Sequence, residues 1–222
     1  MSEQYSSSSG AAEEARLMAA ELLAAAETDA VVSVLAESFS DYPVMRHVLG
    51  GGATYGRRLL TLIGFFVAAR VLRQEPVMGV RDAAGQLAAV AIVTLPRSAP
   101  EPPELTARRE VVWTELGAAA RGRYEAYGTA CSQFANQEPH HHLNMIGVRP
   151  SHAGRGLARV LLEAVEDMAR SDSGSAGVSL TTETSRNVSL YQHFGYRLVG
   201  RARVAEDLDS WSFFRETRLR SS

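Results

Sequence analysis

The spacing of hydrophobic residues in the second half of the chain switches repeatedly between two periods. Between residues 157 and 168, apolar side chains recur at every third or fourth position, which is typical of an amphipathic helix. Apolar runs on either side of this segment favour strands. The predicted order is a strand at 140–148, a helix at 154–170, a strand at 177–182, a short helix at 185–194, and two strands at 197–204 and 210–217.

The first half of the chain is predicted to be mostly helical around one β-hairpin. A helix starts at Thr28, a residue type that caps helices, and ends at the turn Ser40-Asp-Tyr-Pro43. Its apolar stripe is predicted to hold Val31, Val32, Leu35 and Phe39. The other predicted elements are a helix at 57–73, strands at 76–81 and 87–95 joined by a turn at 82–85, a proline-rich loop at 96–103, and a mostly helical stretch at 104–134.

Length and composition indicate a single domain. The 222 residues are 45% hydrophobic, which is enough for one substantial core, and we assign the domain to residues 13–222. Residues 1–12 are rich in serine and are predicted to be a disordered tail. The longest apolar run, at 59–69, is too short to span a bilayer. We expect no secretory signal, no membrane partner and a cytoplasmic location.

Charge and cysteine content exclude several other classes. The formal net charge is −2, the chain contains arginine but no lysine, and the arginines are scattered rather than clustered. This distribution argues against nucleic acid as the main partner. Cys131 is the only cysteine, so neither an intrachain disulfide nor a multi-cysteine metal site is available. No metal site is predicted.

Two glycines occupy the connection between the predicted strand 140–148 and the helix that follows. Pro150 ends the strand, and Gly154 and Gly156 leave the backbone N–H groups at the start of the helix open to a ligand. Free N–H groups and the helix dipole favour an anion such as a pyrophosphate there. An ordinary glycine-rich turn is the alternative, whereas neither the GxGxxG nor the GK[ST] pattern is present.

This turn resembles the acetyl-CoA signature of the GNAT N-acetyltransferase superfamily. Gly156 and Ala158 stand at its two small-residue positions, while Ala153 stands where Gln or Arg is usual. A second resemblance lies in Asn187-Val-Ser-Leu-Tyr191 and the Gly-Tyr pair that follows. The likeness extends from about residue 143 to 199. It implies a mixed α/β fold with a central, largely antiparallel twisted sheet whose middle strands splay apart to admit acetyl-CoA.

The resemblance also implies which residues bind the cofactor. The strand before the turn should bind the pantetheine arm through its backbone, and Gly147 suits either a bulge or a close approach there. Arg155 and Arg159 can add positive charge beside the phosphates. The expected acetyl-CoA site comprises Ile146, Gly147, Val148, Ala153, Gly154, Arg155, Gly156, Leu157, Ala158, Arg159 and Asn187.

The reaction needs a proton donor for the departing thiolate and a base for the amine. Tyr191 is the candidate acid, because a phenol stays protonated at neutral pH; the alternative is a core aromatic residue. His142 is the candidate base, and His140, His142 and Asn144 are predicted to share one face of the strand. Glu138, Glu183 and a water relay remain alternative bases, and a core histidine or a metal ligand are alternative roles for His142.

The acceptor is predicted to lie over the N-terminal helices. Phe39, Asp41 and Tyr42, in or beside the turn at residues 40–43, are the candidate lining residues, and Asp41 could attract a cationic amine, although a solvated aspartate is an equal alternative. We expect a small-molecule amine as partner and either a monomer or a homodimer paired through the final strand. The alternatives to an enzyme are an acyl-CoA-binding sensor and an interaction module that retains the fold.

Overall fold

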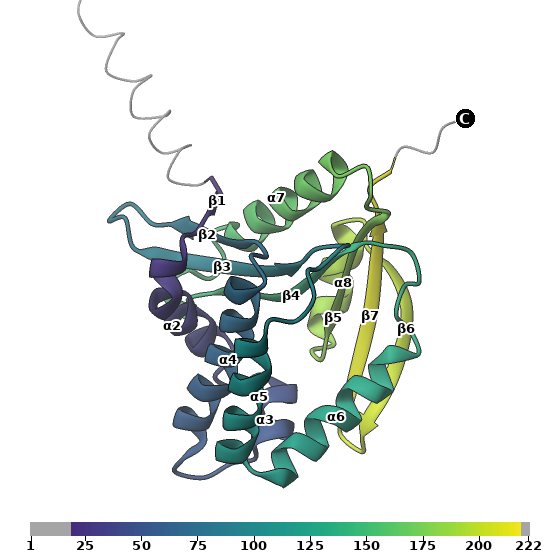
Figure 1. The fold of residues 1–222 in the computed structure, drawn as a ribbon. Helices are drawn as coiled ribbons and strands as arrows, with labels where there is room; N and C mark the ends of the chain where they lie inside the picture. The colour runs from purple at the N-terminus through teal and green to yellow at the C-terminus, as the bar shows by residue number, and fades with distance from the viewer. Residues whose placement is uncertain (1–18, 219–222) are drawn as a thin grey trace, which may run out of the picture.

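A computed structural model describes residues 19–218 (Figure 1). The predicted tail at 1–12 and the predicted start of the domain at residue 13 lie outside the described residues. The described chain forms a mixed α/β fold around a seven-stranded sheet, with strand order β1-β2-β3-β4-β5-β7-β6. The strands are β1 (Glu21–Leu22), β2 (Val77–Arg81), β3 (Leu87–Thr94), β4 (His141–Val148), β5 (Gly177–Thr182), β6 (Arg197–Ala205) and β7 (Leu208–Glu216).

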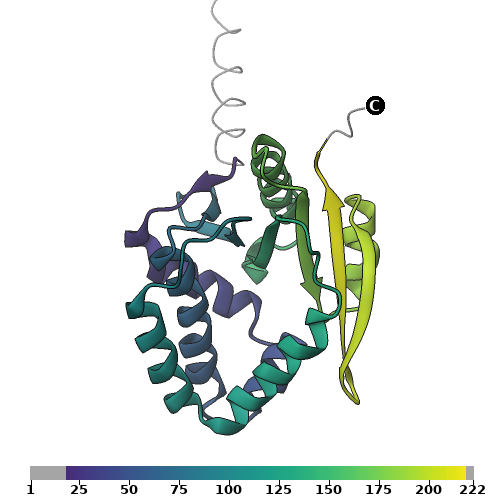
Figure 2. The same ribbon diagram turned by 45° about the vertical axis from the view of Figure 1, so that its right-hand side comes forward.

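Helices cover both faces of the sheet (Figures 1 and 2). One face packs against α7 and α8, and the other packs against the N-terminal helices, so that two hydrophobic clusters form on opposite sides of the strands. The helices are α2 (Thr28–Ser38), α3 (Pro43–Leu49), α4 (Tyr55–Leu72), α5 (Pro103–Leu116), α6 (Ala118–Ser132), α7 (Leu157–Ser171) and α8 (Arg186–His193), with short 3-10 turns η1 (Ala25–Glu27) and η2 (Pro150–His152).

Helix α7 shows how the apolar spacing produces the packing. Leu157, Leu161, Leu162, Val165 and Ala169 recur at helical spacing and are all buried against the sheet. Their burial fixes the helix over β3, β4 and β5. Because the helix begins directly after the turn that follows β4, the same packing also fixes the position of that turn. No helix among residues 19–218 is long and apolar enough to cross a membrane.

The middle strands of the sheet diverge, as the predicted fold requires. All neighbouring strands run antiparallel except β4 and β5, which run parallel and pair only over His141–Leu143 and Val178–Leu180. Beyond these three pairs, β4 stays with β3 while β5 continues beside β7. The register between β3 and β4 shifts next to Ile92, so Asn144 is the extra residue of a bulge. The bulge therefore lies at Asn144 and not at Gly147.

Three features differ from the prediction. Pro43 does not simply end a helix but opens α3, because proline suits the first helical position, where no N–H bond is needed. The predicted helical stretch at 104–134 is two helices, α5 and α6, which meet at Gly117 with a φ of 84°. The final strand β7 lies between β5 and β6 and is therefore not an edge that could pair with a second copy; β6 is the edge strand at that end of the sheet.

Gly147 is required by a close approach between β4 and α2. A Cβ atom at this position would lie 2.9 Å from Cβ of Ser38 and 3.1 Å from Cδ2 of Leu35. We predict that Gly147→Ala lowers the free energy of unfolding by about 1–3 kcal/mol, because the helix must move away from the strand. Urea denaturation measures this change.

Gly122→Ala is the matched control. Gly122 lies inside α6, and a Cβ atom there meets nothing within 4 Å. Its replacement should therefore raise the free energy of unfolding by about 0.5–1 kcal/mol through helix propensity. Equal effects of the two substitutions would contradict the close approach at Gly147.

Candidate active site

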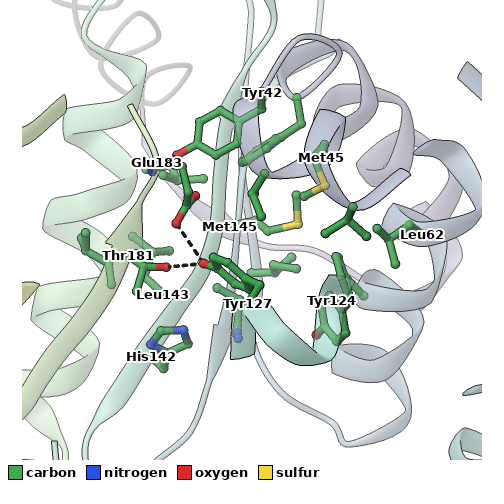
Figure 3. A pocket seen from close by; sticks show the side chains of 18 of the residues that line it. Tyr42, Met45, Leu62, Tyr124, Tyr127, His142, Leu143, Met145, Thr181 and Glu183 are labelled. Carbon is green, nitrogen blue, oxygen red and sulfur yellow. Dashed lines mark hydrogen bonds between the residues drawn. The ribbon is translucent and has the colours of Figure 1, made fainter. Parts of the chain in front are cut away.

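A cavity of about 260 Å³ lies where β4 and β5 diverge. Its walls come from β4, β5 and α8 on one side and from α3, α4 and α6 on the other (Figure 3). The cavity brings together four predicted site residues from two segments, His142 and Ile146 of β4 with Asn187 and Tyr191 of α8. The lining also includes Glu183, which the sequence offered as an alternative base.

Glu183 is a buried carboxyl group, 8% exposed, at the end of β5. Its Oε1 accepts hydrogen bonds from the hydroxyls of Tyr127, at 2.9 Å, and Ser210, at 2.7 Å. The Tyr42 hydroxyl is a third hydrogen-bonding neighbour of the carboxyl group, and within the described part of the chain no arginine pairs with it. Burial raises the pKa of Glu183 above its ordinary value, although these hydrogen bonds oppose the shift. The group therefore takes up a proton at a higher pH than an exposed glutamate does.

Tyr127 and Tyr42 close the cavity around Glu183 (Figure 3). The hydroxyl of Tyr127 reaches from α6 to Glu183 and lies 3.3 Å from the hydroxyl of Thr181. The Tyr42 hydroxyl accepts a hydrogen bond from the backbone N–H of Glu183, at 3.1 Å, and lies 2.9 Å from the hydroxyl of Thr182. Burial raises the pKa of both tyrosines, so both stay protonated.

His142 lines the cavity, and its ring is held by Ser179 of the neighbouring strand. Its Nδ1 lies 2.8 Å from the Ser179 hydroxyl. Burial, with the nearby charges of His140 and Arg70, lowers the pKa of His142 to about 4. The imidazole is neutral at pH 7 but holds a proton only weakly.

Asn144 continues the face of His142, as predicted: burial alternates along β4, and both residues line the cavity. The Oδ1 of Asn144 accepts hydrogen bonds from the Thr94 hydroxyl, at 2.9 Å, and from Arg70, at 3.2 Å. His140 precedes β4 and packs against the ring of Phe214, at 5.8 Å between centroids.

Neither the alternative base Glu138 nor a metal site joins the cavity. Glu138 is exposed and does not line it. In the range 19–218, no group of three or more His, Cys, Asp or Glu residues could hold a metal ion.

Tyr191 lies on α8 with its ring buried against Tyr196 and Phe213. Burial raises the pKa of Tyr191 to about 12, and the Glu183 carboxylate adds to the shift. Among the described residues, nothing hydrogen-bonds its hydroxyl, so the group is available to a ligand in the cavity. Asn187, one turn earlier, also lines the cavity and donates a hydrogen bond to Thr182, at 3.2 Å.

The turn after β4 has the geometry of an anion site. Gly154 and Gly156 have φ angles of 78° and 79°, and a Cβ atom at either position would meet nothing within 4 Å. Residues 153–156 are exposed. The first hydrogen bond of the helix runs from the N–H of Val160 to Gly156, which leaves the preceding N–H groups without intrahelical partners. A phosphate can therefore approach this backbone directly.

The side chains around this turn take different directions. Arg155 is exposed, whereas the guanidinium of Arg159 lies over the ring of Phe194, at 5.6 Å, on the side of α8. Leu157 is buried and Val148 packs beside it in the cluster under α7, so only their backbone groups can face a ligand. Ala158 is half-buried on the first turn of α7, and Ala153 is exposed.

Two of the three predicted acceptor residues line the cavity. The rings of Phe39 and Tyr42 pack at a tilt, with centroids 4.8 Å apart, and both residues line the cavity. Asp41 does not line it: its side chain is 90% exposed and pairs with Arg46 at 3.0 Å. The prediction that Asp41 lines the acceptor site is therefore wrong. Asp41 is a surface residue, because its side chain turns outward while those of Phe39 and Tyr42 turn inward.

Much of the acceptor side was not predicted. Met45 comes from the unexpected helix α3, and Phe66, Tyr124 and Tyr127 come from helices α4 and α6. These residues carry no sequence motif, and only the tertiary packing of three separate helices brings them to one wall. The sequence suggests that the proline-rich loop at 96–103 and the helix after it cover the site. The later part of that helical stretch, α6, does line the cavity through Tyr124 and Tyr127, whereas the loop contributes no lining residue among those described.

Comparisons with known proteins identify the same region. The model of the acetyltransferase (GNAT) family matches residues 92–196, from β3 to the end of α8. A histone acetyltransferase HPA2 and related acetyltransferase from Corynebacterium glutamicum is 18% identical, with 92% of this chain and 98% of that chain covered, at a TM-score of 0.67.

Two further solved structures are similar. The C-terminal condensation domain of Ebony, in complex with β-alanyl-dopamine, is 15% identical, with coverages of 89% and 97% and a TM-score of 0.61. The polyamine N-acetyltransferase of Drosophila melanogaster is 19% identical, with coverages of 88% and 97% and a TM-score of 0.55. At these identities the likeness shows a shared fold.

Because the pKa of His142 is low in the folded protein, the free energy of unfolding should depend on pH between about 4 and 6.5. The folded protein disfavours the protonated imidazole, so stability is full above the ordinary pKa of 6.5 and is lost as pH falls toward 4. We predict that over this window the wild type loses up to about 3 kcal/mol of stability that His142→Gln does not lose, since one pKa unit corresponds to about 1.4 kcal/mol.

Urea denaturation at a series of pH values measures the difference, and NMR titration of the ring reports the pKa directly. His193→Gln is the control, because His193 is exposed, lies outside the cavity and does not contribute to the pKa shift of His142. A pKa near 6.5 for His142 would contradict the buried, neutral imidazole.

Proposed function

The chain carries a domain of the acetyltransferase (GNAT) family at residues 92–196, and from this premise we propose that it is an acetyl-CoA-dependent N-acetyltransferase acting in the cytoplasm on a small-molecule amine. The transfer is direct, without an acyl-enzyme. One observation carries the proposal: the cavity where β4 and β5 diverge holds both a buried carboxyl group, Glu183, and an unbonded phenol, Tyr191, at the strand that leads to the open turn.

The donor site fits a molecule with a pyrophosphate and a long, narrow arm. The N–H groups of residues 154–159, which have no intrahelical partner, would hold the phosphates, and Arg155 lies exposed beside them. The backbone of Ile146, Gly147 and Val148, on the side where β4 has left β5, would hold the arm. Bound acetyl-CoA supplies a thioester carbonyl, whose C–S bond breaks as the C–N bond to the amine forms.

Glu183 is assigned as the base in place of His142. An alkylamine of pKa about 10.4 arrives protonated at neutral pH and must lose a proton before its nitrogen can attack. The carboxyl group of Glu183 lines the cavity without an arginine partner among the described residues, and its raised pKa strengthens the carboxylate as a proton acceptor. His142, with a pKa of about 4, is the weaker acceptor and is assigned to shaping the cavity wall.

Tyr191 is assigned to the departing sulfur. With a pKa of about 12, its hydroxyl is protonated throughout the physiological range. A thiol has a pKa of about 8.5, so the balance favours a strong hydrogen bond from the phenol to the sulfur over complete proton transfer. Tyr191 therefore stabilises the negative charge that develops on the sulfur, and the proton released by the amine nitrogen completes the thiol.

Binding of acetyl-CoA at the turn after β4 can be measured directly. Titration calorimetry should show saturable binding of acetyl-CoA and of desulpho-CoA. In Gly156→Trp the affinity should fall by at least about thirtyfold, because the indole blocks the N–H groups and a φ of 79° disfavours any side chain.

Gly52→Trp is the matched control for this experiment. Gly52 also has a positive φ, 95°, with nothing within 4 Å of its Cβ position, but it lies between α3 and α4, away from the turn. It should bind acetyl-CoA like the wild type. If the wild type fails to bind at millimolar ligand, the enzyme and the acyl-CoA sensor are both excluded and an interaction module remains.

Catalysis should depend on Glu183 and Tyr191. In a thiol-release assay with the fastest acceptor from a panel of aryl, alkyl, polyamine and amino-acid amines, Glu183→Gln and Tyr191→Phe should each lower kcat on the order of a hundredfold. Acetyl-CoA affinity should stay within about threefold, because Phe keeps the ring contacts of Tyr191 and Gln can accept one of the bonds to Glu183. His142→Gln should have an effect below about tenfold.

Tyr55→Phe is the control for removal of a hydroxyl. The Tyr55 hydroxyl is buried without a hydrogen-bond partner in the described chain and does not line the cavity, so its loss should leave kcat unchanged. A larger loss in His142→Gln than in Glu183→Gln would assign the base to the histidine. Binding of acetyl-CoA without turnover of any amine in the panel would favour the sensor.

A further inference from the structure

The wall of the cavity opposite β4 and β5 consists mainly of aromatic side chains and a methionine. The inward-facing side chains opposite β4 and β5 are Phe39, Tyr42, Met45, Phe66 and Tyr124. Aromatic rings and methionines provide a large apolar contact area, and methionine adapts to the shape of a ligand. A ligand body that fills this space must give up water over most of its surface, so an apolar or aromatic body is favoured.

In the part of the chain that the structure describes, the acidic group in the cavity has no ionic partner, whereas the basic group is already paired. Among the described residues that line it, Glu183 is the only acid, and no arginine pairs with it. Arg70 is the only lining arginine in that set, and it is already engaged: it lies 3.0 Å from the buried carboxylate of Glu75 and donates hydrogen bonds to Asn144 and Thr94. The cavity therefore offers a free carboxylate and no free cation.

We propose that the acceptor is a small primary amine with an apolar or aromatic body and no carboxylate. The inference rests on the proposed function and assigns its substrate class. The amine enters as a cation toward Glu183, and the body of the molecule lies against Phe39, Phe66 and Tyr124.

Three other acceptor classes fit poorly. An α-amino acid would place its carboxylate in a cavity that already holds Glu183 and offers no unpaired cation. A polyamine would bury its second cation against an apolar wall.

A peptide also fits poorly, because the cavity is small. The hydroxyl of Tyr127 spans from α6 to Glu183, and the cavity of about 260 Å³ lies below the range of about 300–1,000 Å³ typical of ligand pockets. The space suits a small molecule rather than an extended chain.

Matched acceptor pairs test the proposal. Thiol release from acetyl-CoA is measured with phenethylamine against phenylalanine, with tryptamine against tryptophan, and with both amines against agmatine and spermidine. Each amino acid differs from its amine only by the carboxylate. The expected kcat/KM for phenethylamine or tryptamine is at least about tenfold higher than for the matched amino acid and for either polyamine.

The outcomes separate this inference from the proposed function. If acetyl-CoA binds and an amino acid or a polyamine is the better acceptor, the enzyme stands and the assigned acceptor class is wrong. If acetyl-CoA binds and neither arylalkylamine is acetylated, the acceptor class is also wrong. If acetyl-CoA does not bind, the proposed function itself fails and the inference fails with it.

A variant of the wall gives a second test. Tyr124→Ala removes an aromatic surface on α6 and should lower kcat/KM for phenethylamine at least about tenfold, with unchanged acetyl-CoA affinity as evidence of folding. Val111→Ala is the control, because Val111 is exposed on the neighbouring helix α5 and does not line the cavity. An unchanged kcat/KM in Tyr124→Ala would overturn the assignment of this wall to the acceptor.

Discussion

The parallel ladder between β4 and β5 ends after three residue pairs, and both halves of the site depend on that divergence. If pairing had continued past Leu143 and Leu180, the backbone of β4 would be consumed by hydrogen bonds and the space below it would be filled by strand side chains. The bulge at Asn144 adds to the effect, because an extra residue bends and twists the strand that carries it. The tight contact of Gly147 with α2 then determines where the separated strand lies.

Burial of Glu183 is the electrostatic consequence of this architecture. β5 leaves β4 and runs beside β7, which brings Ser210 to one side of the carboxyl group, while α6 brings Tyr127 to the other. Two neutral hydroxyls stabilise the carboxylate less than an arginine would, so desolvation is only partly offset and the pKa rises. A buried ion pair would have lowered the pKa instead and left a weaker base.

The two halves of the site were not equally predictable from the sequence. The donor half is local: the strand, the turn with Gly154 and Gly156, and helix α7 follow one another directly, so periodicity and glycine placement located them. The second segment, with Asn187 and Tyr191, was also found through its resemblance to a family signature. The fold class was confirmed, with most elements within a few residues of their predicted ends.

The acceptor half could not be predicted in the same way, because its residues meet only through tertiary packing. Tyr127 lies 56 positions before Glu183 in the sequence, yet its hydroxyl donates a hydrogen bond to that carboxyl group. Nothing in the local pattern around Glu183 distinguishes it from a solvated glutamate, whereas His142 had a favourable ordinary pKa of 6.5. Burial reverses which of the two side chains is the stronger base, since desolvation weakens a histidine as a base and strengthens a carboxylate. Under the proposed mechanism, the long-range packing of α6 therefore determines both which group takes the proton and what kind of amine reaches it.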